Sequence, residues 1–170
     1  MENVPTKIKF SRIWSMPSKW TFTIKPIREL LKEEVLGYWI DPFGGYNSPA
    51  QDTNDLDKKA PTKFHMDALE FLKGFKTNSA DGILYDPPYS ITQARMYGKK
   101  EYASMRYWKQ CKDEIARIVK PRGKVICFGW NSNGLGKARR FELGKVLLVA
   151  HGGSKNDTVV TVERKSNDPI

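Results

Sequence analysis

The spacing of apolar residues along the chain changes between helical and strand-like periods. Apolar side chains recur three or four positions apart in three segments, which predicts helices at residues 26–34, 68–75 and 104–119. Pro26 suits the first turn of the first helix, where a missing N–H leaves no bond unmade. Apolar runs predict buried strands at residues 35–40, 82–85 and 124–129. Two shorter strand segments are expected to end near residues 53–56 and 64–66.

The order of these elements predicts the fold class. Strands alternate with helices, and two further strands at residues 145–150 and 158–163 flank the glycine-rich connection 151–157. This order is typical of an α/β protein with a Rossmann-like, doubly wound and mostly parallel sheet, here with an antiparallel C-terminal hairpin at its edge. We also expect a basic loop at residues 90–103 and a short basic helix around residues 137–140.

The composition fits one compact domain with a polyanionic partner. The 170 residues are 39% hydrophobic, which predicts a single domain over residues 1–170. The net charge of +10 favours a polyanionic partner. A soluble basic surface without such a partner is the alternative. The two cysteines, Cys111 and Cys127, have no zinc-like spacing, and no stretch has the length of a membrane span. We therefore expect a cytoplasmic protein that uses no metal.

The tetrapeptide Asp86-Pro87-Pro88-Tyr89 directly follows the apolar run at residues 82–85. Two successive prolines fix φ and lack N–H groups, so the backbone there is extended and presents carbonyl oxygens without a competing donor. The Asp86 carboxylate and the Pro87 carbonyl would accept the two hydrogens of an amino group, while the Tyr89 ring stacks on its plane. The turn therefore predicts a site for an amino-bearing nucleobase, although Pro-Pro after a strand is also an ordinary loop-forming device.

A glycine turn follows the first predicted strand, with the sequence Asp41-Pro42-Phe43-Gly44-Gly45. Doubly wound sheets bind ligands at the carboxyl ends of their strands, where glycines allow close approach and an acid after the second strand holds ribose hydroxyls. Asp55 has the position of that acid, although it would also suit the closure of a turn. Because the chain lacks Gly-x-Gly-x-x-Gly, we expect a nucleoside cofactor without phosphates rather than a dinucleotide.

These motifs resemble those of the S-adenosylmethionine-dependent DNA amino-methyltransferases of the adenine-N6 type. Asp86-Pro87-Pro88-Tyr89 matches the family's catalytic motif, and residues 41–45 look like its Asp-Pro-Phe-Ala-Gly cofactor turn. The resemblance covers about residues 20–163. It implies S-adenosylmethionine as the cofactor, an adenine flipped out of duplex DNA as the substrate, and direct methyl transfer without a metal. It further implies that the cofactor is bound by Thr23, Ile24, Lys25, Pro26, Asp41, Pro42, Phe43, Gly44, Gly45, Asp55, Asp67 and Ala68.

Some of these assignments have simpler alternatives. Asp67 precedes a predicted helix and would equally cap its first turn. Lys25 would also serve as a solvated cation at a helix start. The function has alternatives too: methyl transfer to RNA adenine or to cytosine N4, and a catalytically silent subunit that binds S-adenosylmethionine or DNA.

Basic and aromatic residues after the tetrapeptide favour contact with nucleic acid. The candidate residues are Arg95, Tyr97, Lys99, Lys100, Arg106, Lys137, Arg139 and Arg140. Many members of the resembled family carry a separate target-recognition domain, and we expect none in this chain. Recognition of DNA is then expected to show relaxed specificity, or to involve a homodimer that shares its surfaces.

Overall fold

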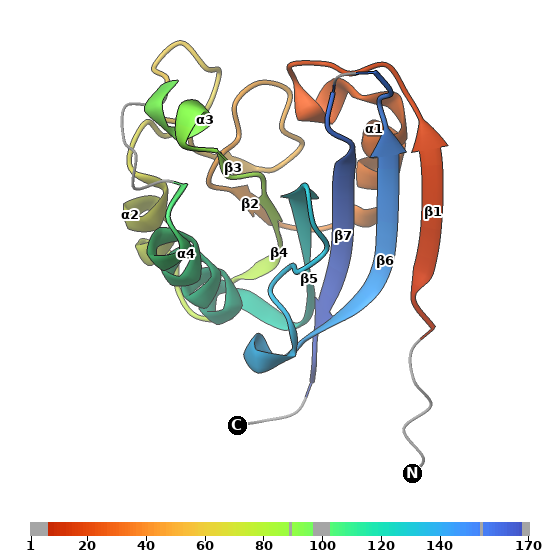
Figure 1. The fold of residues 1–170 in the computed structure, drawn as a ribbon. Helices are drawn as coiled ribbons and strands as arrows, with labels where there is room; N and C mark the ends of the chain where they lie inside the picture. Colours follow the sequence, from red (N-terminus) through yellow and green to blue (C-terminus); the bar gives the residue numbers. More distant parts are fainter. Residues whose placement is uncertain (1–6, 89, 97–102, 154, 168–170) are drawn as a thin grey trace.

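The computed structural model describes residues 7–88, 90–96, 103–153 and 155–167 (Figure 1). In this part of the chain, seven strands form one sheet in the order β1-β6-β7-β5-β4-β2-β3. The strands are β1 (Lys9–Trp14), β2 (Trp39–Asp41), β3 (Asp52–Thr53), β4 (Ala80–Tyr85), β5 (Val119–Gly129), β6 (Phe141–Ala150) and β7 (Thr158–Lys165). The helical elements are η1 (Thr21–Thr23), α1 (Lys25–Glu34), α2 (Ala68–Lys73), α3 (Ile91–Met96), α4 (Met105–Ile118) and η3 (Lys137–Arg139).

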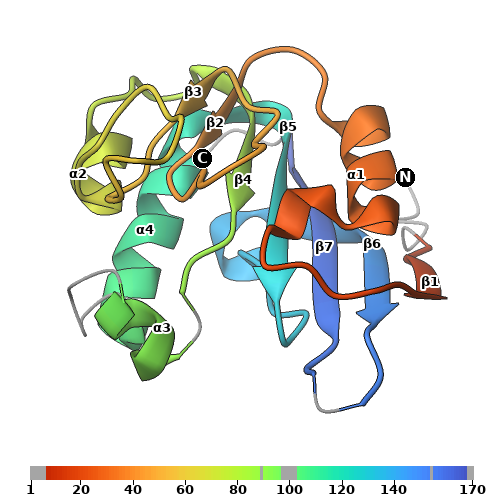
Figure 2. The ribbon, with the colours of Figure 1, turned by 90° about the horizontal axis from the view of Figure 1, so that it is seen from above.

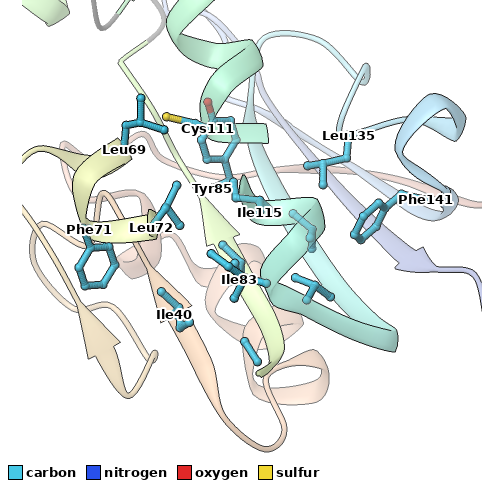
Figure 3. Close-up of a cluster of buried hydrophobic side chains, with 14 of the residues drawn as sticks. Ile40, Leu69, Phe71, Leu72, Ile83, Tyr85, Cys111, Ile115, Leu135 and Phe141 are labelled. Atoms are coloured by element: carbon cyan, nitrogen blue, oxygen red, sulfur yellow. The ribbon is translucent and has the colours of Figure 1, made fainter. Parts of the chain in front are cut away.

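Helices pack on both faces of this sheet, as Figure 1 and Figure 2 show. α2 and α4 cover one face, where Leu72, Ile83 and Ile115 belong to a buried apolar cluster (Figure 3). α1 and η1 cover the other face, where a second cluster includes Ile27 and Trp39. The prediction of a Rossmann-like, doubly wound α/β fold is therefore confirmed.

The sheet is parallel except at β7, which runs antiparallel to both β5 and β6. The predicted hairpin is present, but its place at the edge is wrong, because β1 pairs with β6 and forms the edge of the sheet. The carboxyl ends of β2, β4, β5 and β6 all lie at one edge of the sheet. This edge is uppermost in Figure 1 and faces the viewer in Figure 2.

Several predicted boundaries also differ from the structure. Residues 64–66 contribute only an isolated bridge between Asn54 and Phe64 instead of a strand. Residues 91–96 lie in the segment predicted as a loop, yet they form α3. The strand predicted at residues 124–129 begins earlier, because β5 starts at Val119. The helix over residues 104–119 and the hairpin strands are confirmed within one to four residues.

Side-chain caps begin two of the helices in the described residues. Ser104 Oγ accepts a hydrogen bond from the backbone N–H of Tyr107 at 3.2 Å, and Asp67 Oδ1 accepts one from the N–H of Leu69 at 2.9 Å. Both bonds satisfy N–H groups that the first turn of a helix leaves without partners. Among the described helices, none is both long and apolar enough to cross a membrane.

Candidate active site

A pocket of about 190 Å³ opens at the carboxyl ends of β2, β3 and β4. Three segments enclose it: residues 19–22 around η1, the turn at residues 42–46 after β2, and residues 86–88 after β4. Asn54, Asp55, Leu56, Met66 and Ala68 complete its lining. Ligands of doubly wound sheets bind at this edge, so the fold places the pocket where a ligand is expected.

The glycine turn is held by two buried polar side chains beneath it. Asp41 is fully buried, and its carboxylate accepts hydrogen bonds from Phe43 N at 3.0 Å and Ser48 Oγ at 2.6 Å. Asn54 donates to Pro42 O at 3.1 Å, while the N–H of Gly44 donates to Asn54 O at 2.8 Å. These bonds fix the backbone that borders the pocket.

Burial raises the pKa of Asp41 to about 7. The bonds from Ser48 and Phe43 lower this pKa, whereas the nearby carboxylates of Asp86 and Asp55 raise it further. Asp41 does not line the pocket, so it supports the turn from below.

Asp55 lies across from the glycine turn and keeps acceptor capacity for a ligand. Its Oδ2 accepts the N–H of Gly45 at 3.0 Å, and its Oδ1 accepts the N–H of Asp57 at 2.8 Å. A carboxylate offers about four acceptor positions, so two remain for donors such as vicinal hydroxyls. Gly45 has φ of +46°, a conformation that favours glycine.

Asp86, Pro87 and Pro88 follow β4 directly and line the same pocket. Pro87 and Pro88 are buried, while Asp86 is partly buried. Burial raises the pKa of Asp86 to about 6, and the Thr21 side chain, which lines the same pocket, lowers this pKa in part. Above that pH the carboxylate is ionised and accepts hydrogen bonds. Tyr89 lies outside the described residues.

Aromatic side chains form much of the remaining wall. The rings of Trp20 and Tyr46 lie 4.3 Å apart between centroids, and Lys19 Nζ lies 4.6 Å above the Trp20 ring. Phe43 makes an edge contact with Tyr85, with centroids 5.8 Å apart. Lys19 is the one basic side chain among the described residues that line the pocket. The site therefore combines carboxylates with aromatic surface, which suits a planar or cationic ligand.

The structure brings half of the predicted cofactor residues to the pocket. Those that line it are Pro42, Phe43, Gly44, Gly45, Asp55 and Ala68. Thr23, Ile24, Lys25 and Pro26 lie outside it, because the chain enters the pocket earlier, at residues 19–22. Ile24 is buried in the core beneath η1. Asp67 caps α2, which matches its alternative assignment, and its neighbours Met66 and Ala68 reach the pocket.

The predicted nucleic-acid residues fall at opposite ends of the sheet. Arg95 on α3 and Arg106 in the first turn of α4 are exposed at the pocket end. Residues 137–140 immediately precede β6, whose first residue lies at the edge remote from the pocket. Arg139 is also paired there with Asp113, at 2.8 Å. Joint contact of both groups with one DNA segment at the pocket mouth is therefore not supported, and Tyr97, Lys99 and Lys100 lie outside the described residues.

Neither histidine nor any metal-binding cluster forms a second site in the described part of the chain. His151 is buried between Ser15 O and Thr158 Oγ1, each 2.9 Å from a ring nitrogen. His65 Nδ1 lies 3.2 Å from the carbonyl oxygen of Asp55. Residues 7–88, 90–96, 103–153 and 155–167 contain no group of three His, Cys, Asp or Glu side chains placed to hold a metal ion.

Comparison with known proteins identifies the fold. No family model matches the chain, and no curated protein matches its sequence. TrmN from Thermus thermophilus has a TM-score of 0.55 and 18% sequence identity, over 84% of this chain and 49% of TrmN, so this chain spans about half of TrmN's length. The 1,6-didemethyltoxoflavin-N1-methyltransferase of Burkholderia thailandensis has a TM-score of 0.52 and 12% identity, over 76% of this chain and 71% of that enzyme. That enzyme was crystallised with 1,6-didemethyltoxoflavin and S-adenosylhomocysteine. The chain therefore has a Rossmann-like methyltransferase fold with a β6–β7 hairpin.

Proposed function

We propose that this protein transfers a methyl group from S-adenosylmethionine to the N6 amino group of adenine in DNA. One observation carries the proposal: the turn Asp86-Pro87-Pro88 and the glycine turn at residues 42–46 line the same pocket. A donor site and an acceptor site for a group transfer must meet in this way. The resemblance of both turns to adenine-N6 methyltransferases supports the choice of reaction.

The pocket residues fit the proposed cofactor. Asp55 has acceptor positions left for ribose hydroxyls. Gly45, whose positive φ favours glycine, has no side chain to block the approach of a ligand to the backbone. Trp20 and Tyr46 offer aromatic surface. No cluster of basic residues is available among the described lining residues to hold a pyrophosphate, which favours a nucleoside over a dinucleotide. The cofactor supplies an electrophilic methyl group on a sulfonium centre.

The first role of Asp86 in the proposed reaction would be to orient the amino group of the substrate. Its ionised carboxylate and the Pro87 carbonyl would accept the two hydrogens of an exocyclic amino group and so turn the nitrogen lone pair toward the methyl donor. The nitrogen of adenine N6 is a poor nucleophile, because its lone pair is delocalised into the ring. Acceptors that favour a tetrahedral nitrogen therefore stabilise the transition state more than the ground state. As the carbon–nitrogen bond forms, the amino proton becomes acidic and Asp86 can accept it.

The proposal is tested by incubating the purified chain with labelled S-adenosylmethionine and duplex DNA, single-stranded DNA or RNA. Mass spectrometry of the digested nucleosides should find N6-methyladenine, with duplex DNA as the preferred substrate. Asp86→Ala should abolish the product. Product from RNA alone, or on cytosine N4, would reassign the substrate, and equal activity of Asp86→Ala would refute the mechanism.

Contact with DNA is tested by the salt dependence of binding. We expect the pair of substitutions Arg95→Ala and Arg106→Ala to weaken binding and to reduce the slope of log K against log salt by about two, at about 0.9 per lost phosphate contact. Lys137→Ala with Arg140→Ala is the matched control at the remote end of the sheet. If the control pair reduces the slope and the first pair does not, DNA binds at the other end of the molecule.

A further inference from the structure

The strand β1 forms an open edge of the sheet (Figure 1). Among the described strands, β6 alone pairs with it, so the other side of β1 is open in this part of the chain. Five of the six residues of β1 are exposed. An open edge of this kind can pair with a strand of another chain, unless charged side chains prevent it.

The backbone groups on the open side belong to Phe10, Arg12 and Trp14. Along a strand, successive residues direct their N–H and C=O groups to opposite sides. Just beyond β1, the N–H of Ser15 donates to Ala150 O of β6 at 3.0 Å, and this bond continues the register of the two strands. The odd-numbered residues of β1 therefore bond to β6, while the even-numbered residues direct their N–H and C=O groups outward.

The side chains of β1 expose apolar surface on both faces of the sheet. Phe10 is 64% exposed and shares its face with Arg12, because side chains alternate along a strand. Ile13 is 46% exposed and lies on the other face, where it lines a groove with Glu29 of α1. Exposed apolar side chains gathered along an open edge are typical of an interaction site.

Two-fold symmetry restricts how two copies of β1 can pair. When antiparallel strands are related by an axis perpendicular to the sheet, one residue lies opposite its own copy. Near the middle of β1, this residue is Ser11 or Arg12. With Arg12 at the centre, two guanidinium groups would face each other, which is destabilising. With Ser11 at the centre, Arg12 lies opposite Phe10 of the second copy, and Lys9 lies opposite Ile13.

The register centred on Ser11 gives both cations a favourable partner. The Arg12 guanidinium would meet the exposed ring of Phe10 in a cation–π contact. The aliphatic part of the Lys9 side chain would cover Ile13 of the second copy, with its ammonium group near Glu29 in the adjoining groove. Symmetry makes each contact twice, so the charges on the edge favour pairing in this register.

We propose that the open edge of β1 is a dimer interface, in which the β1 strands of two copies pair antiparallel with Ser11 opposite Ser11. This inference does not depend on the proposed function. β1 runs parallel to β6, and through β7 also to β5 and β4, whose carboxyl ends lie at the pocket edge. Antiparallel pairing would therefore direct the two pockets to opposite edges of one joined sheet, and each pocket would act alone.

Sedimentation velocity of the full chain tests for the dimer. We expect the wild type to sediment at twice the monomer mass at about 100 μM, with a dissociation constant of about 10 μM, as suits a small interface. Phe10→Lys would place an ammonium group opposite each Arg12 and should weaken association at least about tenfold. Phe10→Lys combined with Arg12→Glu should restore the dimer, because the contact becomes an ion pair. Leu36→Lys is the matched control, since Leu36 is 69% exposed in the connection between α1 and β2.

Disulfide formation tests the register. Ser11 would form a non-hydrogen-bonded pair with its copy, with Cα atoms about 4.5 Å apart, which a disulfide can span. Mild oxidation should therefore crosslink Ser11→Cys, and it should leave Arg12→Cys and Ile13→Cys mostly uncrosslinked. The wild type gives the background from Cys111 and Cys127.

Three results would overturn the inference. A wild type that stays monomeric at about 100 μM would show that Lys9 and Arg12 protect the edge instead. Equal association of wild type and Phe10→Lys would place any dimer contact elsewhere on the molecule. Crosslinking of Arg12→Cys or Ile13→Cys in preference to Ser11→Cys would refute the proposed register.

Discussion

Substitution of Gly82 by alanine should damage both the fold and the candidate site, because Gly82 lies where two site-bearing strands touch. Gly82 of β4 pairs directly with Trp39 of β2, and these strands lead to Asp86 and to the glycine turn. A Cβ at Gly82 would lie 2.4 Å from two ring carbons of Trp39 and 2.5 Å from a third. Carbon atoms normally pack about 3.5–4.0 Å apart, so the overlap is about 1 Å or more at three atoms.

The Trp39 ring has little room to move away. It is 1% exposed, and its Nε1 donates to the carbonyl oxygen of Leu36 at 2.9 Å. Overpacking of a rigid core costs about 1–3 kcal/mol, and we place Gly82→Ala at the upper end, about 3 kcal/mol. Gly144→Ala on β6 is the matched control, because its Cβ would meet its nearest neighbour, Val162 O, at an ordinary 3.6 Å.

The assay is equilibrium unfolding in urea, followed by circular dichroism. With a slope of about 2 kcal/mol per molar, Gly82→Ala should lower the midpoint by about 1.5 M, while Gly144→Ala should change it by less than about 0.3 M. In a double-mutant cycle, Trp39→Phe should absorb part of the loss, because phenylalanine lacks the outer ring of the indole. Equal midpoints for the two alanine variants, or strict additivity with Trp39→Phe, would refute the reasoning.

Three further predictions concern the carboxylates. In the proposed reaction, only the ionised form of Asp86 accepts the amino hydrogens, and the pKa of Asp86 is about 6. The rate of methyl transfer should therefore fall about tenfold per pH unit below pH 6. A constant rate from pH 5 to 8 would contradict this role. Asp41 is fully buried with a pKa raised from 3.8 to about 7, so the folded state holds its proton more tightly and stability is lost as pH rises toward 7. In urea unfolding, wild type should lose about 2–3 kcal/mol more than Asp41→Asn between pH 5 and 8, and parallel curves would exclude this effect. Calorimetry should show S-adenosylhomocysteine binding at least tenfold weaker in Asp55→Ala, whereas Asp57→Ala, an exposed neighbour, should leave the affinity within about twofold.

The sequence predicted the elements that bury an apolar face and missed those that do not. β4, β5 and the hairpin strands carry apolar runs and are present close to where they were expected. β1 escaped prediction because five of its six residues are exposed, so no apolar period distinguishes it. α3 was missed for a related reason, since six residues give too little periodicity to separate a helix from a loop.

The site was predictable where chemistry is concentrated in a short motif. Asp86, Pro87 and the glycine turn stand directly after strands, and parallel strands bring their carboxyl ends together. Thr21 and Trp20 carry no motif, and only the path of the chain over the strand ends brings them to the pocket. Residues 137–140 were assigned to DNA contact from charge alone, and charge does not say at which end of a sheet a connection lies.

The distribution of charge supports different ligands inside the pocket and at its rim. The chain carries a net charge of +10, yet Asp41, Asp55 and Asp86 lie in or beneath the pocket, and each has a pKa raised first by burial. A cationic group bound there would relieve the repulsion that Asp55 and Asp86 exert on Asp41, whereas a phosphate would add to it. The same carboxylates would repel the backbone of a nucleic acid. Phosphates would then have to remain at the basic exterior while an uncharged base enters, which is the arrangement that a base flipped out of the duplex requires.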